Sequence, residues 1–355
     1  MKNTSLKDYF PMIRTREEIL TDIEGNSGLH SLFHSWKEEQ QEEFLNFCTG
    51  AKGVKILYDS FFKEILNPES VPQRLEDWLS LLLGQRVRIL NVLPNDSVRI
   101  ADENSLLITD IVVELENGCI ANVEVQKVGY HFPGQRSACY SADLLLRQYK
   151  RVKDEDSKRE RKFSYKDIKD VYTIVLYEKS PKEFKDFPDI YIHRSQQQVD
   201  SGLELELLQK YIFIPLDIFK KTQHNKSISN KLDAWLMFFC AEKPEEILQL
   251  ITQFPEFRPL YEDIYELCRN TEKVMSMFSK ELLELDRNTV QYMIDEMQDT
   301  IDEQKGKLAE QRTALEEKEV VLKEQVSIIQ EKDAALQKKE AEIETLRKKL
   351  AELVK

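Results

Sequence analysis

The sequence predicts an α/β fold followed by a helical subdomain and a C-terminal coiled coil, and three features indicate this. Two runs rich in Ile and Val, 106–115 and 119–128, flank the turn sequence Glu-Asn-Gly and predict an antiparallel hairpin. A nearly continuous apolar run at 171–177 follows a helical pattern and predicts a buried strand. Ile or Leu recurs every seven residues from Ile294 to Leu350, which is typical of a supercoiling helix.

The chain before the hairpin is expected to be mostly helical. Amphipathic patterns at 14–23 and 35–48 predict two peripheral helices, and the patterns at 55–66 and 73–83 predict two more. The run at 87–93 then predicts the first core strand. A helix and a strand are therefore expected before the hairpin in the sequence.

The hairpin carries two acids whose relative position depends on the turn. A two-residue turn would place Asp110 and Glu124 on opposite faces of the sheet. A three-residue turn with Gly118 in a left-handed conformation pairs Leu115 with Cys119 and places both acids on one face. We predict the second register, because two carboxylates that converge among apolar residues favour a shared divalent cation.

The helix predicted from Pro133 to about Arg151 has two different faces. Its polar stripe recurs at three to four residues and consists of Arg136, Tyr140, Asp143 and Arg147. Its opposite face is small and apolar, with Ala138, Ala142, Leu145 and Leu146. We expect the apolar face to pack on the sheet and the polar stripe to lie near the acids.

The strand at 171–177 completes an order of helix, three strands, helix and strand. Further strands are expected at 190–193 and 211–216, so the sheet should extend. Helical patterns follow at 228–241, 245–252 and 260–285. Aromatic residues in the first of them, such as Trp235, are expected to be core.

The hairpin and the helix after it resemble a known family. DIVVELENGCIANVEVQ contains Asp110 and then Glu124-Val125-Gln126, and FPGQRSACYSADLLLRQY contains Gln135, Arg136, Tyr140 and Tyr149. This text resembles the PD-(D/E)XK nuclease superfamily, and within it the Rpn-type, transposase-labelled bacterial branch. A looser likeness extends from about residue 58 to about residue 216. The resemblance implies a restriction-endonuclease-like core, in which helices flank a mixed sheet.

The resemblance also implies a metal site. Asp110 and Glu124 would be ligands of Mg²⁺ or Mn²⁺, with the backbone carbonyl of Val125 as a third ligand. Gln126 stands where the superfamily usually has Lys, as is common in this branch; Gln has no charge and can only orient water or phosphate by hydrogen bonds. Glu76 lies in the helix before the first core strand and is a candidate third acid, although an acid early in a helix also complements the helix dipole.

The candidate DNA-binding residues lie on the helix after the hairpin and are Gln135, Arg136, Tyr140, Arg147, Lys150 and Arg151. The formal net charge of −13 argues against a protein that coats nucleic acid nonspecifically. Residues 147–166 nevertheless contain nine Lys or Arg against four Asp or Glu, a net charge of +5. This basic stretch is interpreted either as a patch that contacts DNA phosphates or as a solvated loop.

Other features of the sequence exclude several classes of protein. No apolar run approaches the roughly 20 residues that cross a bilayer, so no membrane span is expected. Five widely spaced cysteines without a Cys-x-x-Cys pair fit a reducing cytoplasm. Neither a P-loop nor a dinucleotide-binding glycine motif is present in the sequence.

Four segments follow from these patterns. We predict N-terminal helices at 1–50, a nuclease-like domain at 51–220, a helical subdomain at 221–288 and a coiled coil at 289–355, the last forming a homodimer. The predicted function is a metal-dependent DNA endonuclease. The alternative is a catalytically degenerate nuclease fold that binds DNA or serves as a coiled-coil assembly protein. The transposase label implies recombination, but the sequence displays no strand-transfer step.

Overall fold

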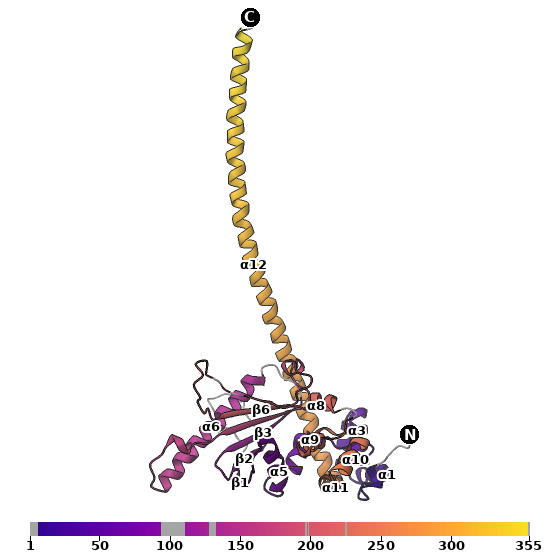
Figure 1. Ribbon diagram of the computed structural model, residues 1–355. Helices are drawn as coiled ribbons and strands as arrows, with labels where there is room; N and C mark the ends of the chain where they lie inside the picture. The colour runs from indigo at the N-terminus through magenta and orange to yellow at the C-terminus, as the bar shows by residue number, and fades with distance from the viewer. Residues whose placement is uncertain are drawn as a thin grey trace. The chain divides into compact units, whose positions relative to one another are not determined.

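The computed structural model describes residues 6–93, 111–127, 133–195, 197, 199–223 and 226–353. It contains one compact unit up to Tyr292 and a second unit from Met293 onward. The first unit is a six-stranded mixed sheet with helices on both faces (Figure 1). An α/β architecture with the strand and helix order expected of a PD-(D/E)XK core is therefore confirmed.

Short helices form the N-terminal part of the first unit. They are η1 Leu6–Asp8, α1 Arg16–Gly25, α2 Ser27–Ser35, α3 Glu38–Cys48, α4 Asp59–Ile65 and α5 Pro72–Leu83. Their ends follow local rules. At α1, Thr15 and Glu18 form a reciprocal capping box. At α5, Pro72 occupies the first turn and Gly84 ends the helix with a φ of 67°.

The sheet has the strand order β1-β2-β3-β4-β6-β5. Its strands are β1 Ile89–Val92, β2 Ile111–Leu115, β3 Ile120–Gln126, β4 Val171–Tyr177, β5 His193–Arg194 and β6 Gln209–Pro215. β1, β2 and β3 are antiparallel neighbours, whereas β3, β4 and β6 run parallel. The parallel β3–β4 pair is connected by a long helix, α6 Pro133–Lys158, as a crossover of this kind requires.

The turn between β2 and β3 has the predicted three-residue form. The Leu115 N–H donates to the Cys119 carbonyl at 2.8 Å, and the Gly118 N–H donates to the Leu115 carbonyl at 2.8 Å. Gly118 has a φ of 84°, in the left-handed region that favours glycine. This register pairs Ile111 with Val123. Asp110, whose place beside Glu124 the register was predicted to give, lies outside the described residues.

α6 is longer than predicted, because it continues past Arg151 to Lys158. Asp156 and Arg161 stabilise its end: the Arg161 N–H donates to the Asp156 carbonyl at 2.8 Å, and the two side chains form an ion pair at 2.7 Å. Glu160 makes the turn with a φ of 55°. Much of the basic stretch at 147–166 is therefore helical rather than loop.

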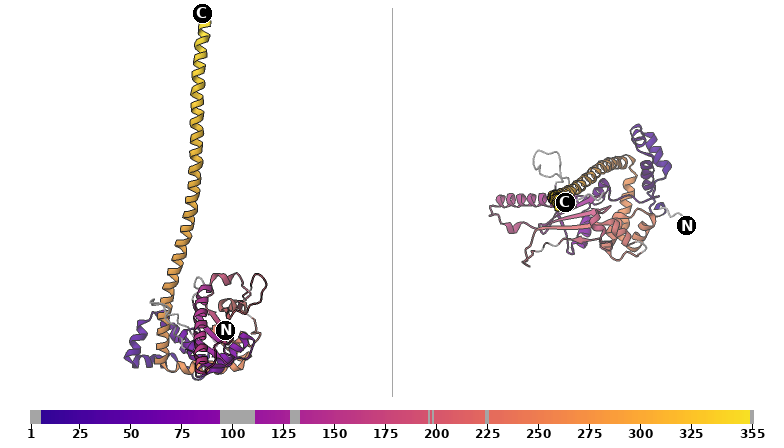
Figure 2. Two further views of the ribbon diagram at one scale, coloured as in Figure 1. Left: turned by 90° about the vertical axis from the view of Figure 1, so that its left-hand side faces the viewer. Right: turned by 90° about the horizontal axis from the view of Figure 1, so that it is seen from above.

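The rest of the described chain forms further helices, and those from α8 onward contribute residues to the core on the face of the sheet opposite α6 (Figure 2). They are α7 Lys182–Lys185, α8 Leu216–Thr222, α9 Lys231–Cys240, α10 Pro244–Gln253, α11 Arg258–Cys268 and α12 Thr271–Leu353, with short turns η2 Tyr165–Asp167 and η3 Pro255–Phe257. The prediction of a single helix at 260–285 is wrong, because two helices, α11 and α12, cover this range and are separated at Arg269 and Asn270. Asn270 caps the new helix by accepting from the Lys273 N–H at 2.9 Å.

One hydrophobic core joins the N-terminal helices, one face of the sheet and α9 to α12. Phe278 of α12 lies within 5.1–6.0 Å of the rings of Trp36, Phe44, Phe47 and Tyr58. The core thus includes residues from three of the four predicted segments. The finer division of the first 292 residues stays a prediction.

The second unit is the continuation of α12. Its described heptad side chains are exposed in the single chain, including Leu308, Leu315, Leu322 and Leu336. The predicted helix is confirmed, while its pairing with a second copy stays a prediction. Among the helices that the structure describes, none is long and apolar enough to span a membrane.

Candidate functional site

A row of polar side chains lies on the inner face of β3. Asn122, Glu124 and Gln126 alternate along the strand, so they share one face of the sheet, and all three are buried. On β4, Thr173 and Tyr177 are paired in register with Asn122 and Gln126. The opposite face of the same strands is apolar and belongs to the main core. The sheet therefore buries a polar face in its centre.

This polar row is incompletely hydrogen-bonded. The Asn122 Nδ2 donates to Glu124 Oε1 at 2.9 Å. Within the described part of the chain, both amide atoms of Gln126, Asn122 Oδ1, Thr173 Oγ1 and the Tyr177 hydroxyl are buried without a hydrogen-bond partner. Buried polar groups are normally paired, and each unpaired one costs about 1–3 kcal/mol. Such a cluster is expected where a protein binds polar ligands.

α6 covers this polar face, but with a different side from the predicted one. Its buried residues include Ser137, Tyr140, Ser141, Leu144 and Gln148. The alanines that were expected to face the sheet are exposed, and Leu146 is 62% exposed, so that Leu145 is the one member of the predicted face that packs on the sheet. The prediction was wrong because it assumed an apolar sheet face. Hydroxyl and amide groups fit this polar face better, and Ser137 and Ser141 are small enough for close packing.

The two ends of α6 can be placed on the sheet by their contacts. Gln148 lies near the hairpin turn, because its Nε2 donates to the Gly118 carbonyl at 2.9 Å and its Oε1 accepts from the Lys169 N–H at 3.0 Å. Arg136, in the first turn, lies near the other end of the strands. Burial raises the pKa of Tyr177, and the charge of Arg136 opposes that rise. Because Gln148 lies at the start of β3, the N-terminus of α6 lies toward the carboxyl end of that strand, where Gln126 is.

Arg136, Gln135 and Tyr140 are arranged along this first part of α6. The Arg136 Nη2 donates to the Tyr140 hydroxyl at 2.9 Å, and the guanidinium lies 5.5 Å from the centre of the Tyr140 ring. Tyr140 is buried, whereas Gln135 and Arg136 are exposed. The guanidinium is therefore held at the edge of the polar face and remains accessible to solvent.

The backbone of β3 directs Val125 and Lys127 away from the polar row. The Gln126 carbonyl accepts from the Glu178 N–H at 2.9 Å on the β4 side. Carbonyls alternate along a strand, so that of Val125 points to the β2 side. The Lys127 side chain lies on the other face in a buried ion pair with Glu281 of α12. Lys127 therefore does not replace the lysine that the motif usually has at position 126.

The structure gives Glu76 a contact outside this row. Its Oε1 accepts from the Ile89 N–H at 2.8 Å, at the start of the edge strand β1. β1 is two strands away from β3, which corresponds to roughly 10 Å across the sheet. Glu76 thus holds the edge strand, and a role as third acid stays a prediction.

The basic residues in the middle of α6 differ in their availability. Arg147 forms an ion pair with Asp143 at 2.5 Å. Arg151 pairs with Glu114, which also accepts from the Asn91 amide at 2.8 Å. Lys150 is exposed. The three basic residues Arg147, Lys150 and Arg151 line a cavity of about 470 Å³ along α6.

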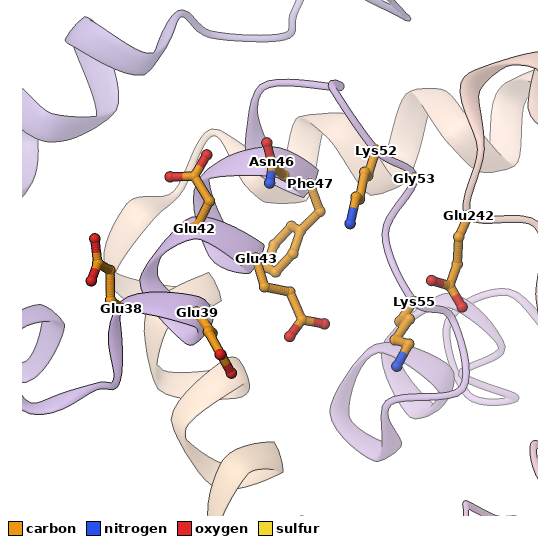
Figure 3. Close-up of a pocket in the computed structure, with 10 residues that line it drawn as sticks. All are labelled: Glu38, Glu39, Glu42, Glu43, Asn46, Phe47, Lys52, Gly53, Lys55 and Glu242. Carbon is orange, nitrogen blue, oxygen red and sulfur yellow. The ribbon is translucent and has the colours of Figure 1, made fainter.

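A larger cavity of about 740 Å³ lies elsewhere in the first unit (Figure 3). Its lining contains the carboxylates of Glu38, Glu39, Glu42, Glu43 and Glu242, together with Lys52 and Lys55. Figure 3 shows the acids of α3 on one side of the cavity and the two lysines on the other, with the Glu43 carboxylate turned toward the lysines. A mainly acidic lining repels phosphate, so this cavity is not a candidate DNA site.

The described residues do not contain a complete metal site. No group of three or more His, Cys, Asp or Glu side chains among them is arranged to hold a metal. The predicted ligand set includes Asp110, which is not described. Glu124 and the carbonyl of Val125 are the members of that set that the structure places.

The family follows from a comparison of the sequence with protein families. A family described as "PD-(D/E)XK nuclease family transposase" matches residues 56–296, about two thirds of the chain. The chain therefore belongs to this family. No curated protein and no solved structure matches the chain.

Several residues of the polar face were missed by reasoning from the sequence. Asn122 precedes Glu124 by two residues, so its period-2 spacing was a usable signal. Thr173 and Tyr177 lie in a strand that reads as apolar, and their place beside Asn122 and Gln126 depends on strand pairing. The sequence alone carries no signal for that pairing.

Proposed function

We propose that the chain is a metal-dependent DNA endonuclease whose site is the polar face of β3 beneath the start of α6. The buried row Asn122, Glu124 and Gln126 carries this proposal, because amide atoms of Asn122 and Gln126 lack a hydrogen-bond partner among the described residues. It coincides with the motif that the sequence shares with the family, and it meets the N-terminus of a helix. Membership of the nuclease family and this row support the same location.

The residues of the site fit a hard divalent cation. Mg²⁺ and Mn²⁺ prefer oxygen ligands. Asp110, Glu124 and the carbonyl of Val125 would supply them, and the unpaired oxygen of Gln126 lies one residue further along β3. When bound, the cation supplies positive charge that stabilises the transition state and makes water acidic near neutral pH.

The chain's own groups would bind and orient the scissile phosphate. The amide of Gln126 can donate through Nε2 to a phosphate oxygen and accept through Oε1 from the attacking water. The N–H groups at the N-terminus of a helix attract phosphate, and the Arg136 fork at the start of α6 adds charge. Water then forms a new P–O bond, the phosphodiester P–O bond breaks, and the leaving oxygen takes up a proton.

Nicking of supercoiled plasmid with Mg²⁺ or Mn²⁺ tests this function. Asp110→Ala and Glu124→Gln should abolish nicking, while Glu116→Gln at the exposed tip of the same hairpin should nick like the wild type. Circular dichroism should show that all three variants are folded. Equal nicking by the wild type and Glu124→Gln would disprove the proposed site.

Binding without cleavage would support the alternative, a degenerate nuclease fold that binds DNA or assembles through its tail. Anisotropy of labelled DNA separates the two outcomes, because a degenerate protein would bind DNA with either metal present and leave it intact. A role in recombination, as the family description suggests, requires strand transfer after cleavage. An assay for joined products tests that step separately.

We further propose that the tail forms a homodimer through its heptad positions and that the protein acts in the cytoplasm. The exposed Ile and Leu residues of α12 support the first proposal, since burying each is worth roughly 1.5–3 kcal/mol. Lys and Gln residues three positions further on weaken the pairing. The free state of all five cysteines, four of them buried, supports the second.

A further inference from the structure

Three aromatic rings form a cluster where the end of α6 meets η2. Tyr149 and Phe163 are in edge-to-face contact with centroids 5.3 Å apart, and so are Phe163 and Tyr165 at 5.0 Å. Tyr149 and Tyr165 are nearly parallel, with an interplanar angle of 19° and centroids 6.2 Å apart. We call these three residues the aromatic platform.

The outer ring of the platform is exposed but fixed in place. Tyr165 is 74% exposed, whereas Tyr149 and Phe163 are half-buried beneath it. Ser164 caps the η2 turn by accepting from the Lys166 N–H, and Ile168 is buried directly after the turn. A large aromatic face thus remains open to solvent. Because the ring is already held in place, it would lose less side-chain entropy on binding a ligand than a mobile ring would.

Exposed lysines are frequent in the segment that carries the platform, residues 149–166. Lys150, Lys153, Lys158, Lys162 and Lys166 are all exposed. The Lys153 Nζ lies 5.7 Å from the centre of the Tyr149 ring. The neighbouring arginines are engaged differently, since Arg159 pairs with Glu155 and Arg161 with the buried Asp156. The lysines outnumber the exposed acids of this segment, which are Asp154, Glu155, Glu160 and Asp167.

We propose that the aromatic platform stacks on an unpaired base of the DNA while the surrounding lysines contact its backbone. Aromatic faces among cations are the usual means by which proteins bind single-stranded nucleic acid. Bases within a duplex are already stacked and offer only their edges, so a duplex could use the lysines but not the ring. This inference rests on the proposed function and specifies its substrate, which is DNA with a single-stranded or unstacked stretch.

A purely structural role would leave a different arrangement. Rings that only fasten the segment after α6 to the helix would be buried against it, as Tyr149 and Phe163 partly are. The third ring adds little burial, because most of its surface faces water. Removal of Tyr165 therefore separates binding from folding.

The test is the affinity of the full chain for a labelled oligo-dT strand and for a duplex of the same length, measured by anisotropy in EDTA. Tyr165→Ala should weaken single-strand binding roughly 5- to 150-fold, which corresponds to about 1–3 kcal/mol per stacked base. Duplex binding should stay within about twofold, because it depends on phosphate contacts. Tyr165→Phe should retain binding to both, since it keeps the ring.

Controls make each outcome decisive. Phe187→Ala removes another exposed aromatic ring, 52% exposed, outside the platform and should leave both affinities unchanged. Thermal melting should show that Tyr165→Ala is as stable as the wild type. Unchanged single-strand affinity in Tyr165→Ala, or an equal loss on both DNAs, would overturn the inference.

The platform and the nuclease site can fail separately. If the wild type binds oligo-dT in a Tyr165-dependent way but never cuts, the endonuclease proposal fails and the platform stands. If the wild type cuts plasmid and Tyr165→Ala retains full single-strand affinity, the platform proposal fails and the endonuclease proposal stands.

Discussion

The buried ion pair between Lys127 and Glu281 offers the sharpest test of how the strand beside the site is held. The side chains are 6% and 0% exposed, and the second oxygen of Glu281 accepts from the Asp59 N–H at 2.8 Å. Lys127→Met would leave a buried carboxylate with only the Asp59 hydrogen bond and with Glu284 nearby. Breaking one side of a buried pair costs about 3–5 kcal/mol, and we expect that loss in the free energy of unfolding.

The double variant Lys127→Met, Glu281→Gln should recover most of this loss. Glutamine keeps the acceptor for the Asp59 N–H and removes the unpaired charge, so the double variant should lie within about 1–2 kcal/mol of the wild type. Urea denaturation followed by tryptophan fluorescence measures both values. The exposed pair Arg16–Glu42 is the control, and its removal should have little effect because solvent screens it.

The same variants report on catalysis. The folded double variant should nick plasmid like the wild type, because Lys127 lies on the face of β3 opposite Glu124. A cost below about 1 kcal/mol for Lys127→Met would refute the energetic reasoning. Loss of nicking in a stable double variant would refute the assignment of faces instead.

Four further results are expected. Gln126→Met removes two unpaired buried atoms and should raise the free energy of unfolding by about 1–2 kcal/mol without metal, measured in urea, while nicking falls. Glu160→Gly should raise the free energy of unfolding by about 0.5 kcal/mol, because glycine adopts the φ of 55° without strain. A slightly higher thermal midpoint would show this. Burial raises the pKa of Glu281 above its usual value of 4.5. The wild type should therefore lose stability relative to Glu281→Gln as the pH rises from 4.5 through the raised pKa, because the buried carboxyl group must ionise. Parallel curves of unfolding free energy against pH from 4 to 8 would contradict this. A chain ending at Tyr292 should sediment as a monomer at micromolar concentrations at which the full chain is a dimer, and equal masses would remove the coiled-coil pairing.

Local sequence signals predicted most strands and the hairpin turn well, but the strand expected at 190–193 was largely wrong, because β5 is only His193–Arg194. The strand at Val171–Tyr177 has the predicted bounds, because a continuous apolar run between polar ends has few other structures available. The hairpin register followed from Gly118, since a left-handed residue at that place fixes the turn length. The order of helices and strands could be read for the same reason.

Contacts distant in the sequence were harder to predict. The buried face of α6 was wrong because hydropathy treats Ser137, Ser141 and Gln148 as solvent-facing, and only a polar sheet face reverses that preference. The partner of Lys127 lies 154 positions away and has no local signature. The metal ligand role of Asp110 stays a prediction from the motif.

The place of Phe278 among four rings from the first 60 residues has a consequence for synthesis. About 220 residues separate Tyr58 from Phe278, which a ribosome adds in roughly 10–40 s. During that interval Trp36, Phe44 and Phe47 lack the ring that completes their core, so the nascent chain presents an aromatic surface that chaperones recognise. A chain truncated before residue 278 would retain that surface permanently. The first turns of α12 therefore complete the hydrophobic core of the first unit.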